Sequence, residues 1–78
     1  MVEPQSIEQS IRAGLAVIHC EVSGDGAHFD AVIVSPAFEG LSRVRRHQLV
    51  YGTLGERMGG EIHALSMKTY SPGEWAAR

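Results

Sequence analysis

The sequence predicts an α+β domain in which helices cover one face of a three-stranded mixed sheet. Three observations predict this class: an apolar stripe at helical spacing near the amino terminus, three strand-like stretches, and helical segments between the second and third of these stretches. A helical connection between two strands favours their parallel pairing through a right-handed crossover. The predicted element order is therefore α-β-β-α-α-β.

The first helix is predicted to begin near Pro4. The stretch Ser6–Gln9 fits the capping-box pattern, in which a serine is followed three residues later by glutamate or glutamine. Ile7, Ile11 and Leu15 then repeat at four-residue spacing. They form one narrow apolar stripe, which is typical of a helix that packs on a core.

The first strand is predicted over residues 16–22, where apolar and polar residues alternate. Ile18, Cys20 and Val22 point to one side of this strand, and His19 points to the other side. The pattern is typical of a half-buried strand. It predicts that the His19 side chain is exposed to solvent.

The second strand is predicted over residues 28–35, because Asp25–Gly26 is a hairpin signal and β-branched residues follow it. Pro36 ends this strand, since proline cannot donate to the ladder of a sheet. His28 lies where the turn meets the strand. On a turn flanked by glycines it is expected to be mobile, and to lose conformational freedom if it binds a ligand.

Three further helical segments are predicted in the second half of the chain. Ser42 is a good N-cap for the longest of them. Residues 54–58 follow as a second short helix. Ser71–Glu74 is another capping pattern, with proline at the first helical position, so Trp75 is placed in a terminal helical turn that its burial anchors. The apolar residues of the longest helix are Val44, Leu49, Val50 and Tyr51.

The third strand is predicted over residues 61–70. Leu65 and Met67 are expected to face the core, and His63 lies on their side near the start of the strand. The orientation of His63 is therefore expected to be largely preset by the strand.

Composition restricts the class of protein. The 78 residues form one domain, residues 1–78, and a net charge of -2 does not favour binding of polyanions by overall charge alone. No apolar run approaches the length of a membrane span, and the first ten residues lack the basic flank and apolar centre of a signal peptide. Cys20 is the only cysteine, which excludes an internal disulfide. We expect a soluble, cytoplasmic domain in a reducing compartment, with no membrane partner.

His28 lies in the turn and His63 at a strand start, so the predicted fold brings both imidazoles to one rim of the sheet. An imidazole binds a metal through an unprotonated ring nitrogen. From the residues alone, the simpler interpretation is that His28 is solvated and that His63 completes a hydrogen bond. Cys20 lies on the apolar side of its strand and is predicted to be a buried hydrophobic residue instead of a thiolate ligand.

A cluster of basic residues marks the predicted helical region, and Glu56 partly offsets its charge. The simpler interpretation is a solvated helix face, and the functional one is a surface that contacts nucleic-acid phosphates or an acidic partner. His47 is more consistent with a structural or surface role than with a ligand. The residues of this candidate surface are Arg43, Arg45, Arg46, His47 and Arg57.

Other functional signals are weak or absent. The string Gly52–Gly55 matches the glycine-x-x-glycine loop of KH modules, but neither variable position is basic and Leu54 is predicted to be a core residue. No nucleophile with a base, paired-carboxylate site or phosphate loop with its lysine is recognisable. The sequence therefore predicts a binding module, and it does not predict an enzyme.

Two stretches, "FEGLSRVRRHQLVYGTL" and "IHALSMKTYSPGEW", resemble the BolA family. The resemblance covers nearly the whole chain, and "VSGDGAHF" further resembles the branch of the family with a histidine in the turn. The matching residues are Phe38, Gly40, Ser42, Arg46, His47, Val50, Tyr51, His63, Ala64, Leu65, Thr69, Tyr70, Pro72 and Trp75.

The resemblance implies a KH-like class II fold, which agrees with the element order predicted above. It also implies pairing with a monothiol glutaredoxin and a [2Fe-2S] cluster shared with that protein and glutathione, with no cofactor in the isolated chain. In that picture His63 is one cluster ligand and His28 a second. The alternative function is a nucleic-acid-binding transcriptional regulator that uses the arginine-bearing helix.

Overall fold

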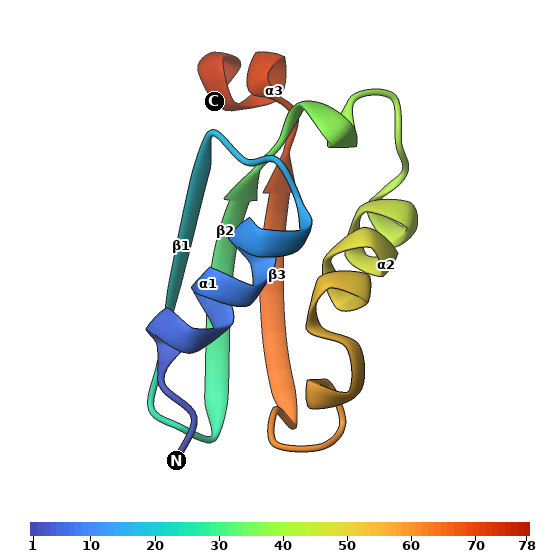
Figure 1. The fold of residues 1–78 in the computed structure, drawn as a ribbon. Coiled ribbons are helices and arrows are strands. Elements are labelled where there is room, and N and C mark those ends of the chain that lie inside the picture. Colours follow the sequence, from blue (N-terminus) through green and yellow to red (C-terminus); the bar gives the residue numbers. More distant parts are fainter.

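The computed structural model describes all 78 residues as one mixed sheet with helices on both of its sides. Two single 3-10 turns, Pro36–Phe38 and Gly55–Arg57, flank the central helix. The main elements in chain order are α1 (Pro4–Gly14), β1 (His19–Gly24), β2 (His28–Val34), α2 (Arg43–Leu54), β3 (Ala64–Tyr70) and α3 (Pro72–Ala77), as drawn in Figure 1.

The sheet has the order β1-β2-β3. β1 and β2 form an antiparallel hairpin, and β2 and β3 pair in parallel from His28↔Ala64 to Val34↔Tyr70. The predicted α+β class and the predicted parallel crossover are both confirmed. Because β2 and β3 run in the same direction, their amino-terminal ends lie together at one end of the sheet.

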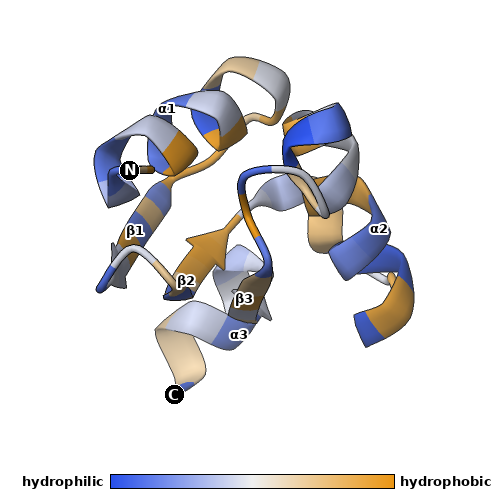
Figure 2. Cartoon of the chain, turned by 90° about the horizontal axis from the view of Figure 1, so that it is seen from below, coloured by the Kyte–Doolittle hydropathy of each residue, from blue (hydrophilic) through white to orange (hydrophobic).

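The core lies between the sheet and two helices. α1 and α2 lie on the same side of the sheet in Figure 2, and the buried residues of both helices belong to one core cluster with those of β1 and β2. The fully or almost fully buried residues of this core come from every main element except β3 and α3. They are Ile7, Ile11, Cys20, Phe29, Ala31, Ile33, Phe38, Val50, Leu54 and Ile62. Leu65 and Met67 of β3 pack against this cluster, as predicted.

The opposite face of the sheet is covered only at one end, where α3 lies (Figure 2). The pairing register places His19 and Tyr70 in the same row. The Trp75 ring stacks on the His19 ring at 5.0 Å between centroids and lies 5.2 Å from the Tyr70 ring. His19 is therefore half-buried under an aromatic side chain, and the prediction that it is exposed is wrong. Trp75 does hold the terminal helix against the sheet, although it is only partly buried itself.

Local signals predicted two helix caps correctly and one incorrectly. The Ser42 hydroxyl accepts from the Arg45 N–H, and Ser71 and Glu74 form a complete capping box. α1 begins at Pro4, as predicted, but Glu3 is its N-cap, so Ser6 lies inside the helix and the capping box predicted there does not form.

Strand boundaries also differ from the prediction. β1 begins at His19, which leaves Ile18 outside the ladder and 59% exposed. β3 begins at Ala64, so His63 precedes the strand. The second short helix predicted over residues 54–58 is a 3-10 turn, Gly55–Arg57, in the structure. Gly55 has a φ of 56° and ends α2. None of the helices is both long and apolar enough to cross a membrane.

Candidate functional site

His28 and His63 lie at the same end of the sheet. His28 is the first residue of β2, and its Cα pairs with that of Ala64, the residue that follows His63. Neighbouring strands lie about 4.8 Å apart, so the two backbones are close at this point. Both side chains are exposed. We call this pair of residues, His28 and His63, the histidine rim.

The turn before β2 is held by hydrogen bonds. The Asp25 carboxylate accepts from the N–H groups of Ala27 and His28, both at 2.9 Å, and the Asp25 N–H donates to the His28 carbonyl at 3.2 Å. The N–H of His28, followed by that of Ala27, lowers the pKa of Asp25. Gly26 takes the left-handed conformation, with φ of 97°. The backbone of His28 is thus tied to Asp25, contrary to the expectation of a mobile turn.

Arg57 ties α1 to the loop that carries His63. Its guanidinium donates to the Ser10 hydroxyl at 2.7 Å and to the Ser6 hydroxyl at 2.8 Å, and its Nε bonds to the Glu61 carboxylate. Arg57, Ser6 and Glu61 line a hollow together with His63. Arg57 was predicted to belong to the candidate basic surface. That prediction is wrong, because these contacts engage the guanidinium within the fold.

The imidazoles of the histidine rim have no partner within the chain. Among the four histidines, only His19 forms a side-chain hydrogen bond, with Glu21 at 3.4 Å. No group of three or more His, Cys, Asp or Glu side chains lies close enough to hold a metal ion. The rim can therefore offer two imidazole nitrogens, a partial ligand set. Cys20 adds no thiolate there, since it is buried, as predicted, and burial raises the pKa of its thiol.

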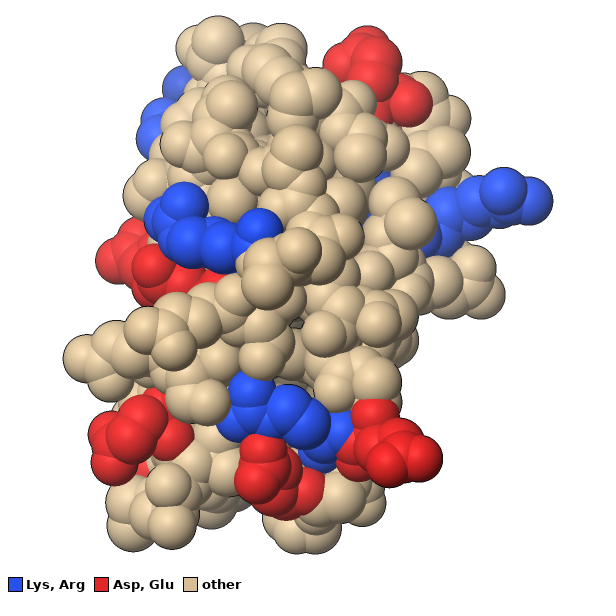
Figure 3. All heavy atoms as spheres, in the orientation of Figure 1, with Lys and Arg blue, Asp and Glu red and all other residues tan.

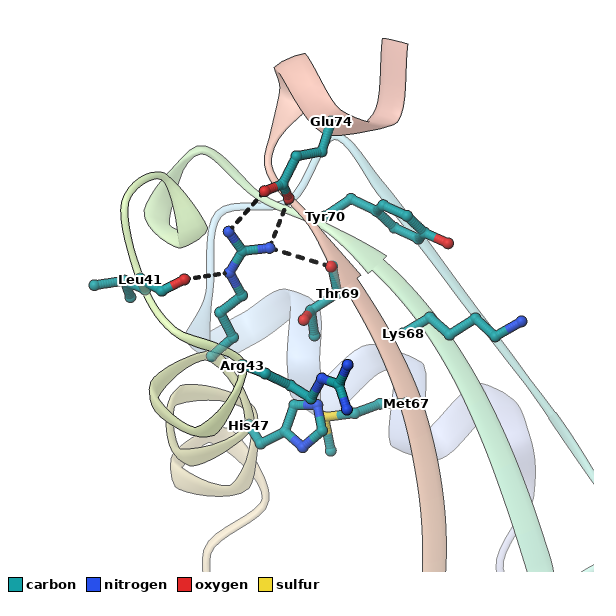
Figure 4. A pocket seen from close by; sticks show the side chains of 9 residues that line it. Leu41, Arg43, His47, Met67, Lys68, Thr69, Tyr70 and Glu74 are labelled. Carbon is teal, nitrogen blue, oxygen red and sulfur yellow. Dashed lines mark hydrogen bonds and ion pairs between the residues drawn. The ribbon is translucent and has the colours of Figure 1, made fainter. Parts of the chain in front are cut away.

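Arg46 is also a structural residue, which corrects its place in the candidate basic surface. Its side chain is 11% exposed and lies between α2, β3 and α3 (Figure 4). It donates from Nε to the Leu41 carbonyl at 2.9 Å and from Nη1 to the Thr69 carbonyl at 3.2 Å. Both terminal nitrogens bond to the Glu74 carboxylate, at 2.6 and 3.0 Å. The hydrogen bonds from Arg46 lower the pKa of Glu74 to about 2.

The remaining basic side chains do not gather into one patch on the face shown in Figure 3, where several blue groups lie against red ones. Arg43 and Arg45 are exposed at the start of α2. His47 is half-buried, with its ring edge-on to Tyr51 at 6.5 Å between centroids. The string Gly52–Gly55 falls within the end of α2, and its Leu54 is 3% exposed, so no free glycine loop exists there.

Comparison with known proteins identifies the family. Residues 2–74 match the family described as "BolA-like protein". The chain belongs to the BolA family. A BolA-family relative, the acid stress protein IbaG of Escherichia coli, is 42% identical over 76 residues, which cover 96% of this chain and 90% of that protein. A BolA homologue of Coxiella burnetii has a similar solved structure, with a TM-score of 0.85, 48% identity, and coverage of 97% of this chain and 99% of that one.

Another BolA relative has a name that bears on nucleic acids. The DNA-binding transcriptional regulator BolA of Haemophilus influenzae is 39% identical over 61 residues, which cover 78% of this chain and 59% of that protein. Names in this family therefore include both a stress protein and a DNA-binding regulator.

Proposed function

We propose that this BolA-family chain is a partner of a monothiol glutaredoxin and shares a [2Fe-2S] cluster with it through His28 and His63. The observation that carries the proposal is the histidine rim. Two exposed imidazoles without intramolecular partners stand at neighbouring ends of two parallel strands. The family resemblance supplies the identity of the partner, and the function follows as cluster trafficking or iron and redox regulation.

The donor chemistry of the rim suits a shared cluster better than one held alone. A [2Fe-2S] centre takes four protein ligands, and in Rieske centres two of these are histidines on one iron. The rim contributes two nitrogens at most, and the raised pKa of the buried Cys20 thiol disfavours the thiolate that iron needs. The sulfur ligands must therefore come from outside the chain. By family resemblance they are the glutaredoxin cysteine and the cysteine of bound glutathione.

Reconstitution with the glutaredoxin and glutathione tests the ligands. We expect His63→Ala and His28→Ala each to remove or strongly destabilise the mixed cluster, because each takes away one nitrogen donor. The measurement is visible absorption and circular dichroism of the cluster, together with its decay time. Far-ultraviolet circular dichroism should stay unchanged, since both side chains are exposed.

His47→Ala is the matched control, because it removes an imidazole from α2 at a distance from the rim. It should leave the cluster spectrum and decay time unchanged. If His63→Ala and His28→Ala both gave the spectrum and lifetime of the unmodified protein, the ligand assignment would be wrong. A stable cluster in this chain reconstituted alone would contradict the sharing.

A DNA-binding regulator is the second candidate, supported by the name of the Haemophilus relative and by exposed Arg43 and Arg45. With Arg46 and Arg57 engaged inside the fold, few phosphate contacts remain available. We expect only weak DNA affinity that falls steeply from low to physiological salt. Tight, sequence-selective binding by the metal-free protein at physiological salt would reverse the ranking of the two functions.

A further inference from the structure

β3 has one free edge. The strand order β1-β2-β3 gives β3 a neighbour on one side only. A free edge presents unpaired N–H and C=O groups, which can pair with an extended segment of another chain. The question is which backbone groups of β3 point outward and whether they can be reached.

The pairing of β3 determines which groups point outward. Tyr70 directs its carbonyl toward β2, where it accepts from the Ser35 N–H at 3.0 Å. Backbone groups of alternate residues point to opposite sides of a strand, so those of Met67 and Thr69 point to the free edge. Arg46 confirms this direction, because it approaches the Thr69 carbonyl from outside the sheet. The Met67 N–H and carbonyl and the Thr69 N–H remain for a further strand.

A hollow of about 690 Å³ runs along this edge, between β3 and α2. Four consecutive residues of β3, from Met67 to Tyr70, line it, although their side chains alternate between the two faces of the sheet. A hollow that all four residues line must therefore run along the edge of the strand, because their side chains do not share a face. Figure 4 shows the hollow from close by, with Arg43, His47 and Met67 on the side of α2 and Lys68 on the other side of the strand.

The charge of the hollow is positive, although the chain carries a net charge of -2. Arg43 and Lys68 are exposed and line it from the two sides of the edge. Glu74 is its only acidic residue, and Arg46 occupies that carboxylate with two hydrogen bonds. Carboxylates of a partner would therefore meet two free cations and no free anion.

We propose that the free edge of β3 binds an acidic, extended peptide segment of a partner protein, which adds a fourth strand to the sheet. Met67 and Thr69 supply the backbone hydrogen bonds, and Arg43 and Lys68 select glutamate or aspartate side chains on the peptide. This surface lies at the carboxyl-terminal end of β3. The histidine rim is at the other end of the strand, since His63 lies about 13 Å from Met67 and about 20 Å from Thr69 at 3.3 Å per residue.

A peptide fits this edge better than a nucleic acid does. A peptide can both accept from the Met67 N–H and donate to the Met67 carbonyl, whereas a phosphate backbone has no donor for the carbonyl. Two aromatic rings line the hollow, and both are engaged within the chain: that of Tyr70 with Trp75 and that of His47 with Tyr51. Base stacking, on which binding of single strands relies, has no free aromatic surface there.

The test uses the full chain and a fluorescein-labelled octapeptide in which pairs of glutamates alternate with pairs of valines, with fluorescence anisotropy as the measurement. Because successive side chains of a strand point to opposite faces, this peptide carries carboxylates on both sides of the edge, where Arg43 and Lys68 lie. The double variant Arg43→Glu, Lys68→Glu should weaken binding about tenfold or more, since both cations are reversed. Arg45→Glu is the matched control: it makes the same charge change on α2 but outside this hollow, and it should change affinity less than about twofold.

Two further probes test the backbone hydrogen bonds. The same peptide with N-methyl groups on every backbone nitrogen should bind at least about tenfold more weakly, because neither of its edges can then donate to β3. Bound peptide should slow hydrogen exchange of the Met67 and Thr69 amides and leave that of Lys68, which faces β2, unchanged.

Several results would overturn the proposal. Equal binding of the N-methylated peptide would show that no strand is added. An equal loss for Arg45→Glu would show that the attraction is not local to the hollow. Binding of a twelve-residue oligothymidine with the same dependence on Arg43 and Lys68, and none of the acidic peptide, would assign the surface to nucleic acid.

Discussion

Replacement of Arg46 by alanine tests the assignment of this residue to the fold. Its side chain joins three elements: it bonds to the Leu41 carbonyl before α2, to the Thr69 carbonyl of β3, and to the Glu74 carboxylate of α3. Arginine and alanine are both good helix formers, so the substitution changes the contacts and leaves the helix propensity of α2 nearly the same.

The magnitude follows from those contacts. A hydrogen bond from a charged donor contributes about 1.5–3 kcal/mol, and two carbonyl oxygens lose such a donor in Arg46→Ala. Water can enter the open hollow beside these two carbonyl oxygens and replace part of the lost hydrogen bonding. We therefore expect the free energy of unfolding to fall by about 3 kcal/mol. The Glu74 side chain is half exposed and returns to water, so it adds little. A domain of 78 residues has an unfolding free energy of about 4–12 kcal/mol, of which this loss is a large part.

Urea unfolding at pH 7, followed by far-ultraviolet circular dichroism and by the fluorescence of Trp75, measures the effect. With a slope of about 1 kcal/mol per molar urea, the midpoint should fall by about 3 M. Arg45→Ala is the control, because the exposed Arg45 side chain makes no hydrogen bond within the fold, and it should cost about 0.5 kcal/mol or less. If the two variants lost similar amounts, below about 1 kcal/mol, Arg46 would be a surface residue after all.

Two further predictions concern titration and reactivity. Arg46 lowers the pKa of Glu74 from its ordinary 4.5 to about 2, so the ionised carboxylate stabilises the fold above pH 4.5 and this contribution is lost as the pH falls toward 2. Glu74→Gln should therefore lower the urea midpoint at pH 7. The difference between its midpoint and that of the unmodified protein should narrow as the pH falls from 4.5 to 2. If the midpoints of the two proteins kept a constant difference over this pH range, the coupling of Glu74 to Arg46 would be contradicted. Burial raises the pKa of Cys20, so its thiol should react with Ellman's reagent only as fast as the domain opens and at the rate of a free thiol in urea. Fast reaction in the native state would show that Cys20 is accessible and could serve as a ligand.

The elements that sequence patterns predicted well are those whose signals are local. Ser42 and Ser71 cap helices because each side chain reaches an N–H three residues ahead, a distance that spacing alone determines. The capping prediction at Ser6 failed because Pro4, already compatible with a first helical turn, starts α1 earlier. The side chain of Ser6 bonds instead to Arg57, far along the chain.

The position of the histidine rim could be predicted from the sequence, but the hydrogen bonds around it could not. Parallel pairing of two strands joined by a helix implied that the starts of β2 and β3 meet, and this brings His28 and His63 to one end of the sheet. The hydrogen bonds that hold the turn at His28 were not predicted, although Asp25, which accepts two of them, was recognised as part of a hairpin signal. The role of the rim as a ligand pair stays a prediction.

The sequence by itself determined the α+β class, the order of the main elements, the parallel crossover and part of the core, namely Ile7, Ile11, Cys20, Val50 and Leu54. These follow from periodicity and turn chemistry, which act over a few residues. The tertiary structure alone decided what the long polar and aromatic side chains do. Arg46 meets Glu74, Arg57 meets Ser6 and Ser10, and His19 meets Trp75, each across 28 or more residues. No spacing rule joins such pairs, because their distance is set by how α1, α2 and α3 pack on the sheet. Two side chains of the predicted basic surface, those of Arg46 and Arg57, are thus internal links, while Arg43, Arg45 and the free edge of β3 stay exposed.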